Sequence, residues 1–274
     1  MNFGLIVIGD ELLSGKREDK HVPKVIELLR ARGLALAWVR FVGDDPERIT
    51  DDLKDAFAAA AQGDVVFSCG GIGATPDDHT RQCAARALGV SLELHPQARD
   101  FIVERMRQTA REQGSEFDPD RHDNVHRLNM AVFPQGADIV PNPYNKIAGF
   151  SLRPGAGQGG VFFVPGFPVM AWPMIEWVLD ERFAHLHQQQ GGVEQSVIVF
   201  GAMEAALTPL MEAIESHFVG IKVFSLPSVD HPQWGRHIEL GVKGDAAQLD
   251  AAYAQMLAGL RAVGAELGPE LLRK

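Results

Sequence analysis

The sequence predicts an α/β fold with a mostly parallel sheet, followed by a small α+β domain. Apolar runs of strand length alternate with amphipathic helical patterns through the first two thirds of the 274 residues. Such alternation is typical of a parallel sheet with helices on both faces. Gln188–Gly192 then has the composition of a linker, and a second strand–helix pattern follows it. We therefore expect two domains, residues 1–187 and residues 193–266.

The first elements are predicted from their periodicity. Phe3–Ile8 is apolar throughout, which predicts a buried strand, and Leu34–Val42 predicts the next strand. Between them, Val22–Arg32 repeats apolar residues at helical spacing and ends at a glycine. Asp45 followed by Pro46 is typical of a helix N-cap and first turn, so another helix is expected there.

The third strand leads into a glycine cluster. Asp64–Ser68 predicts this strand, and the chain then enters Gly70–Gly73. One helix is predicted from near Pro76 to Gly89, and another near Gln97–Gln108.

The middle of the chain is less regular. Gln113–Arg127 is polar, which predicts a surface excursion. A helix is expected after the break at Pro165–Pro168, with an inward face that comprises Met170, Met174, Trp177 and Val178. Short strands are predicted at Met130–Phe133, Ile139–Val140, Gly149–Leu152 and Val161–Val164.

The second domain shows the order strand, helix, strand, strand, helix. This βαββα order is typical of a small two-layer α+β domain. The predicted elements are a strand at Val197–Phe200, a helix from Leu207 to Phe218, strands at Ile221–Leu226 and His237–Val242, and a helix from Leu249 to Leu260.

Composition excludes several classes of protein. No stretch approaches the roughly 20 apolar residues that span a bilayer, and no basic segment precedes the first apolar run. Two cysteines without CxxC spacing indicate neither a disulfide framework nor zinc, so a cytoplasmic protein is expected. The net charge of −10 disfavours a nucleic-acid partner.

The motif that indicates chemistry most strongly is the stretch from Ser68 to Thr80, at a strand-to-helix turn. In open parallel sheets, ligands bind at the carboxyl ends of strands, where glycines let the backbone approach a phosphate. Asp77 and Asp78 follow the glycines, and a carboxylate beside a phosphate site is suited to magnesium-type coordination or to general base work. The alternative is purely structural, because Thr75 with Asp78 also fits a capping box.

A second stretch, Gly9–Lys16, follows the first strand and carries Asp10 and Glu11. If the first and third strands are neighbours, both loops face one cleft, and Asp10, Asp77 and Asp78 share a divalent cation. The alternative for this stretch is a solvated turn.

Two more turns are candidates for ligand contact. Pro141–Phe150 forms a rigid turn in which Lys146 is available for an anion, and Pro165–Pro168 is another strand-end turn. Among other residues with reactive side chains, Cys69 is expected to pack as a small apolar residue. The polar-context histidines, none with metal-ligand spacing on a helix, are His21, His79, His122 and His126.

Four ordered motifs, GDELLSG, GGIGATPDDHT, PNPYNKIAGF and PGFP, resemble the MoaB/Mog-type molybdopterin-binding domain. The resemblance is closest to the N-terminal part of CinA (competence/damage-inducible) proteins and covers about residues 1–175. It implies a three-layer αβα fold, a homo-oligomer, and an anionic ligand over the GGIG loop. It also implies binding or catalytic roles for Ser68 and Asp78 and a magnesium contact for Asp10. The expected ligand-binding set is Ser68, Gly70, Gly71, Gly73, Thr75, Lys146, Pro165 and Gly166.

The sequence departs from the family pattern at one position of the glycine loop. Ile72 stands where relatives have threonine, which removes a hydroxyl and argues against pterin adenylylation. The C-terminal amidase domain of CinA proteins is also not expected in a chain that ends at Lys274.

The resemblance to CinA implies metal-dependent hydrolysis of ADP-ribose at its pyrophosphate. The leading hypothesis is therefore a nucleotide pyrophosphatase that uses Mg, Mn or Co, with Asp10 and Asp78 as catalytic residues. The alternatives are a molybdopterin-binding protein without hydrolase activity, and a regulatory or scaffold protein whose ancestral site has decayed.

Overall fold

The computed structural model describes residues 1–153, 159–187 and 194–273. The chain divides into two compact units, Met1–His187 and Gln188–Lys274. The predicted linker Gln188–Gly192 lies outside the described residues.

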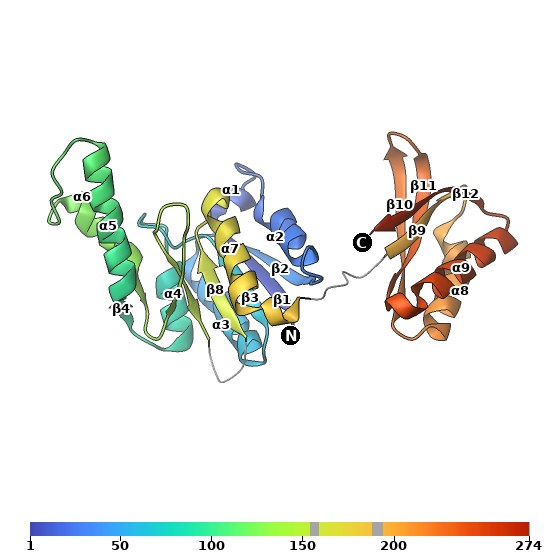
Figure 1. The fold of residues 1–274 in the computed structure, drawn as a ribbon, viewed down its shortest axis with the longest axis horizontal. Coiled ribbons are helices and arrows are strands. Elements are labelled where there is room, and N and C mark those ends of the chain that lie inside the picture. The colour runs from blue at the N-terminus through green and yellow to red at the C-terminus, as the bar shows by residue number, and fades with distance from the viewer. Residues whose placement is uncertain (154–158, 188–193, 274) are drawn as a thin grey trace. The chain divides into compact units, whose positions relative to one another are not determined.

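The first unit is built on a six-stranded sheet in the order β2-β1-β3-β8-β7-β6 (Figure 1). β1, β2, β3 and β8 run parallel, whereas β7 and β6 are antiparallel to their neighbours. The mostly parallel sheet is therefore confirmed. The strands are β1 Phe3–Ile8, β2 Leu36–Val42, β3 Val65–Cys69, β6 Asp138–Val140, β7 Gly149–Leu152 and β8 Gly160–Val164.

Helices cover both faces of this sheet. Alternate residues of β1 divide between two cores, with Leu5 in the core beneath α2 (His21–Arg30) and α7 (Pro168–Arg182), and Ile6 in the core beneath α3 (Pro46–Ala61). This division follows from the period of two in a strand whose faces are both buried. The arrangement confirms the predicted three layers.

Two helix boundaries illustrate how local chemistry sets the elements. The Asp45 side chain accepts the amide of Arg48 at 2.8 Å, with Pro46 in the first turn of α3, as predicted. In contrast, α4 spans Thr80–Leu88, so the predicted start near Pro76 is wrong. The preceding residues form a turn instead, which brings the helix start four residues later.

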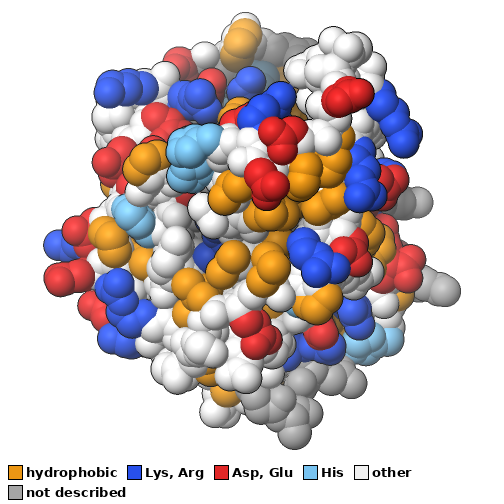
Figure 2. Space-filling model, turned by 90° about the vertical axis from the view of Figure 1, so that its left-hand side faces the viewer, with side chains coloured by type: hydrophobic (Ala, Val, Ile, Leu, Met, Phe, Trp, Pro, Cys, Tyr) orange, Lys and Arg blue, Asp and Glu red, His pale blue; other side chains and the backbone are white. Residues whose placement is uncertain are grey.

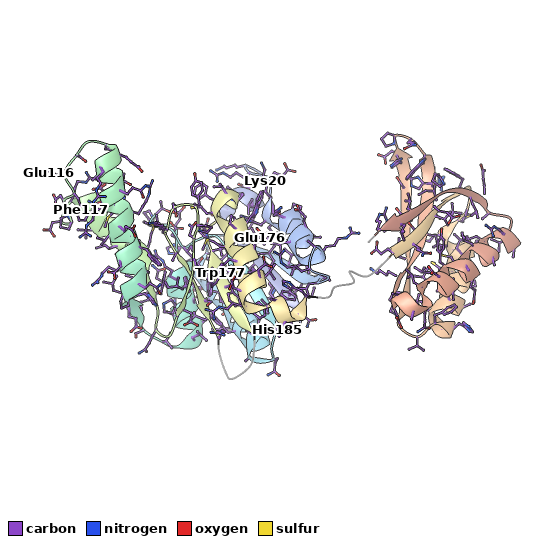
Figure 3. All side chains as sticks on the ribbon, in the orientation of Figure 1. Lys20, Glu116, Phe117, Glu176, Trp177 and His185 are labelled. Carbon is purple, nitrogen blue, oxygen red and sulfur yellow. The ribbon has the colours of Figure 1, made fainter. Side chains whose placement is uncertain are left out.

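The segment after α5 (Pro96–Glu112) is more ordered than the predicted surface excursion. It contains α6 (His122–Leu128), and the guanidinium of Arg107 lies 5.4 Å from the ring centroid of Phe117, which Figure 3 labels beside α5. β4 (Leu92–Leu94) and β5 (Val132–Pro134) pair nearby as a two-stranded ribbon. Two further short elements were not predicted, α1 (Asp10–Leu13) and the 3₁₀ turn Asn129–Ala131.

The inward face of α7 differs in part from the prediction. Met174 and Val178 are buried, but Met170 and Trp177 are only half-buried, and Figure 3 shows Trp177 on this helix. On its exposed side, Glu176 and Asp180 accept hydrogen bonds from Arg32, which ties α7 to the chain just after α2. A short 3₁₀ turn, Ala184–Leu186, follows α7.

The second unit is an antiparallel sheet in the order β10-β11-β9-β12, with α8 and α9 packed against it. The predicted elements occur in the predicted order, but a further strand, β12, pairs with β9 beyond the last predicted helix. The elements are β9 Glu194–Phe200, α8 Glu204–His217, β10 Ile221–His231, β11 Gly235–Gly244, α9 Ala246–Ala262 and β12 Glu266–Arg273.

Across the described ranges, no helix combines the length and the apolar character needed to cross a membrane. The face shown in Figure 2 carries acidic and basic side chains interspersed with apolar ones, so charge of one sign does not dominate it.

Candidate functional site

The glycine loop lies where β3 ends, at the carboxyl edge of the sheet. Gly70 and Gly71 have φ of 111° and 67°, values that L side chains rarely adopt. A Cβ at Gly70 would collide with the carbonyl oxygen of Ile8, and one at Gly71 with the hydroxyl of Thr80. The loop therefore requires glycine at both positions, because Ile8 and Thr80 pack directly against its backbone.

Thr80 anchors this loop from the start of α4. Its hydroxyl donates to the carbonyl of Gly70 at 3.1 Å, and its amide donates to the carbonyl of Gly71 at 3.0 Å. Because Thr80 is buried, solvent does not compete directly for these bonds.

The residues after the glycines close on themselves. The Asp78 carboxylate accepts both the amide and the hydroxyl of Thr75, and the amide of Asp78 donates to the carbonyl of Thr75 at 3.0 Å. Thr75 and Asp78 thus bond to each other as the capping-box alternative expects, although α4 itself begins only at Thr80. Half of the Asp78 carboxylate is used within the turn.

The glycine loop forms one wall of a pocket of about 510 Å³. Since β1 and β3 are neighbours, the loop after β1 faces the same pocket, as the sequence hypothesis required. The opposite wall comes from the turn before α7 and from the segment between β6 and β7. The predicted site residues that line this pocket are Gly70, Gly71, Gly73, Thr75, Asp77, Asp78, Pro165 and Gly166.

Three predicted site residues do not line it. Ser68 is 0% exposed within β3, and its hydroxyl has no hydrogen-bond partner in the described chain. Lys146, which has a positive φ of 65°, directs its ammonium to Glu104 at 2.6 Å. Its neighbours Asn145 and Ile147 line the pocket instead.

Asp10, the third, supports a loop rather than lining the pocket. Its amide donates to the Asp44 carboxylate at 2.9 Å, and its own carboxylate accepts the amide of Asp44 at 3.1 Å. This reciprocal pair joins the ends of β1 and β2 and places Asp44 in the pocket wall.

Asp44 is a site residue that the sequence analysis missed. Burial raises the pKa of its carboxyl, and the charges of Asp10, Glu11 and Asp77 raise it further, whereas the hydrogen bond from Asp10 lowers it. The available signal was its position two residues after the predicted strand that ends at Val42. Arg17, Asn145 and Phe167 also line the pocket and were not predicted.

The predicted metal ligands are not assembled around one point. Within the residues that the structure describes, no group of three or more His, Cys, Asp or Glu side chains is arranged to hold a metal ion. Asp10 is engaged by Asp44 and Asp78 by Thr75, so these side chains do not fit a preformed cation site. The divalent cation therefore stays a prediction.

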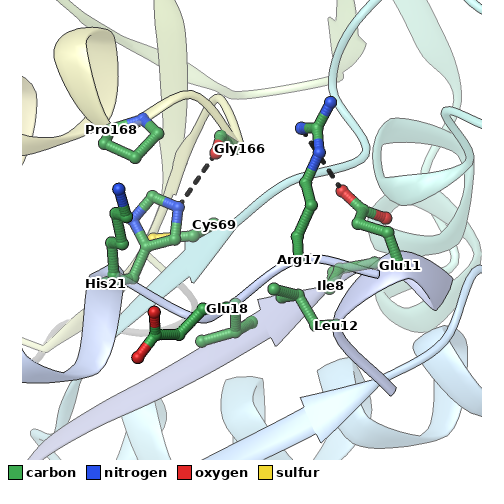
Figure 4. Close-up of a pocket in the computed structure, with 11 residues that line it drawn as sticks. Ile8, Glu11, Leu12, Arg17, Glu18, His21, Cys69, Gly166 and Pro168 are labelled. Carbon is green, nitrogen blue, oxygen red and sulfur yellow. Dashed lines mark hydrogen bonds and ion pairs between the residues drawn. The ribbon is translucent and has the colours of Figure 1, made fainter. Parts of the chain in front are cut away.

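A second pocket of about 420 Å³ adjoins the first and shares Ile8, Glu11, Arg17 and Gly166 with it. In Figure 4 the Arg17–Glu11 ion pair, 3.8 Å long, lies opposite His21 and Cys69. This pocket extends the surface that a ligand of the glycine loop would meet.

His21 corrects the prediction of a polar setting, because it is only 4% exposed. Burial lowers the pKa of its imidazole, so the neutral ring donates from Nε2 to the carbonyl of Gly166 at 3.0 Å (Figure 4). Cys69 is fully buried, as expected, and burial raises the pKa of its thiol.

His122 and His126 correct another expectation. They lie one turn apart on α6, with their Nε2 atoms 3.2 Å apart, so two of the histidines do have helical spacing. This spacing was not predicted, because Gln113–Arg127 is polar and shows no apolar periodicity that marks a helix.

The fold and this pocket define the class of the first unit. It is an α/β domain with a glycine loop at the carboxyl edge of its sheet. A family model described as a probable molybdopterin binding domain matches residues 4–185, and the chain belongs to this family. It is 35% identical over 215 residues to a CinA-like protein of Citrifermentans bemidjiense, covering 77% of this chain and 47% of that protein. It is 31% identical over 228 residues to a CinA-like protein of Syntrophotalea carbinolica, covering 80% of this chain and 51% of that protein.

The chain thus spans about half the length of the curated relatives it matches. Among solved structures, it resembles the crystal structure of the protein CinA from Thermoplasma acidophilum, with a TM-score of 0.54 and 22% identity. That match covers 66% of this chain and 99% of the other, and it shows the shared fold. The resemblance found in the sequence motifs is confirmed.

Proposed function

We propose that residues 1–187 bind a phosphorylated pterin, of molybdopterin type, in the glycine-loop pocket. The observation that carries the proposal is that the glycine loop lines the pocket at the carboxyl end of β3, where Gly71 and Gly73 carry no side chains to keep an anion from the backbone. The amide of Gly70 donates to the carbonyl of Val164 at 3.0 Å, so an anion would meet the loop amides that follow it. The membership in a probable molybdopterin-binding family supports a pterin as the ligand.

The rest of the pocket wall suits a flat, hydrogen-bonding ring. Phe167 lines the pocket and is 56% exposed, so its ring is available for stacking. The carboxylate of Asp44 is an acceptor for the amino and ring N–H groups of a pterin. We therefore place the ring against Phe167 and the phosphate over Gly70–Gly73.

Replacing Phe167 tests this placement. Phe167→Ala should weaken molybdopterin binding about 10-fold, since stacking on an aromatic side chain contributes roughly 1–3 kcal/mol per base. Binding is measured by titration calorimetry with molybdopterin under anaerobic conditions. Phe41→Ala is the matched control, because Phe41 is 46% exposed on β2 and does not line the pocket. Equal affinities of the two variants would contradict the placement.

Hydrolysis of ADP-ribose, aided by Mg, Mn or Co, is a second candidate function. The observation in its favour is the acidic side of the pocket, where the charges of Asp10, Glu11 and Asp77 act on Asp44. Their combined negative charge would attract a divalent cation, although no preformed cation site is assembled among the described residues.

This candidate is tested by AMP release from ADP-ribose with each metal in turn. Asp44→Asn and Asp78→Asn should each abolish a metal-dependent release, while Asp51→Asn, an exposed position on α3, should retain it. If the unsubstituted protein releases no AMP with any metal, the hydrolase candidate is excluded. A homo-oligomer and a cytoplasmic location likewise stay predictions.

A further inference from the structure

A third pocket lies on the far side of the turn that closes with Asp78. It measures about 520 Å³ and is walled by the start of α4, by α6 and by the turn that follows α6. Ala74, Thr75 and Asp78 line both this pocket and the glycine-loop pocket, so the turn separates two cavities. The proposed function uses only the side of this turn that faces the glycine-loop pocket.

Arg81 is the notable group in its wall. The side chain is only 4% exposed, and Nη2 donates to the carbonyl of Gly73 at 2.6 Å while Nη1 donates to the carbonyl of Asn129. Both partners are neutral. Nε is buried without a hydrogen-bond partner, and no carboxylate of the described chain forms an ion pair with Arg81.

An arrangement of this kind leaves a buried charge without its usual compensation. Buried arginines are ordinarily paired with an anion, because removal of a charge from water is costly. Burial accordingly lowers the pKa of Arg81, which the charge of Asp78 only partly offsets. The Asp78 carboxylate is itself hydrogen-bonded to Thr75, so it is not the partner that the guanidinium lacks.

We propose that this third pocket is a second anion site, in which Arg81 binds a phosphate group. A guanidinium has five N–H donors in a planar fork that matches a phosphate, and carbonyl groups account for only two of them here. His79, Gln82 and His126 line the same pocket and supply further polar contacts. The site does not depend on a pterin in the glycine-loop pocket.

The test is an NMR titration of the ¹⁵N-labelled protein with inorganic phosphate, followed at the arginine Nε–H signals. We expect one Nε–H signal, which is absent from the spectrum of Arg81→Lys, to shift with rising phosphate concentration until it reaches a plateau. The titration curve of this signal gives the affinity of the site. If this signal does not move, or if phosphate shifts only the amides of Gly70–Gly73, the proposal is overturned.

Two further variants test the site whether or not Arg81→Lys folds. His79→Gln should weaken phosphate binding several-fold, whereas His217→Gln, an exposed histidine of α8, should bind as the unsubstituted protein does. An unchanged affinity in His79→Gln would contradict the proposed lining. Phosphate bound at Arg81 in a protein that binds no pterin would uphold this site and refute the proposed function, so the two are separable.

Discussion

At the scale of single residues, the shape of the glycine loop depends on Gly70 and Gly71, where neighbouring atoms leave no space for a Cβ. The glycines of the loop were expected from the motif, and their positive φ explains why no other residue fits. Lys146 and Asp10 were assigned to the site by position along the chain. Their side chains instead bind Glu104 and the loop of Asp44, because neighbours that are distant in sequence decide where a side chain points.

Asp44 supports a prediction about stability. The pKa of Asp44 is higher in the folded protein than in the unfolded chain, chiefly because of burial. As pH rises from the unfolded pKa to the folded pKa, ionisation of Asp44 therefore lowers the stability of the fold. Asp44→Asn keeps an oxygen acceptor for the amide of Asp10 and removes this charge.

We therefore expect Asp44→Asn to melt at a higher temperature than the unsubstituted protein at pH 7, with the difference disappearing below about pH 4, near the ordinary pKa of aspartate. Calorimetric scans across this pH range make the measurement. A variant less stable at pH 7, or a difference independent of pH, would contradict the assigned cause.

At the scale of elements, apolar periodicity predicted the central strands and most helices. β1 and β7 have the predicted bounds, and both are buried along their whole length. Elements with few apolar residues escaped prediction, as in α6, whose segment contains several charges and histidines. β12 was missed because a glycine and a proline interrupt it, although pairing with β9 overrides that local preference.

Thr80, the first residue of α4, is hydrogen-bonded to the glycine loop. Thr80→Val should lower the free energy of unfolding by about 1–3 kcal/mol, because it leaves the buried carbonyl of Gly70 without the hydroxyl donor. Thr80→Ser keeps that donor and serves as the control, though it removes a methyl group. Urea unfolding followed by tryptophan fluorescence gives the comparison, and a Thr80→Val variant as stable as Thr80→Ser would show that this bond does not hold the loop.

At the scale of the whole molecule, the chain consists of two units whose cores share no residue. The sequence anticipated a large α/β unit and a small α+β unit, because each has its own pattern of strands and helices. It did not anticipate that the Ala74–Asp78 turn separates two pockets, since that depends on how α6 packs near the start of α4.

We propose that a pterin binds at the glycine loop, and an amide map of the ¹⁵N-labelled protein tests this most directly. Addition of molybdopterin should shift the amides of Gly70–Gly73 and of Phe167 in a saturable manner. Shifts confined to the second unit, or none in the glycine loop at saturating ligand, would contradict the assignment of the pocket.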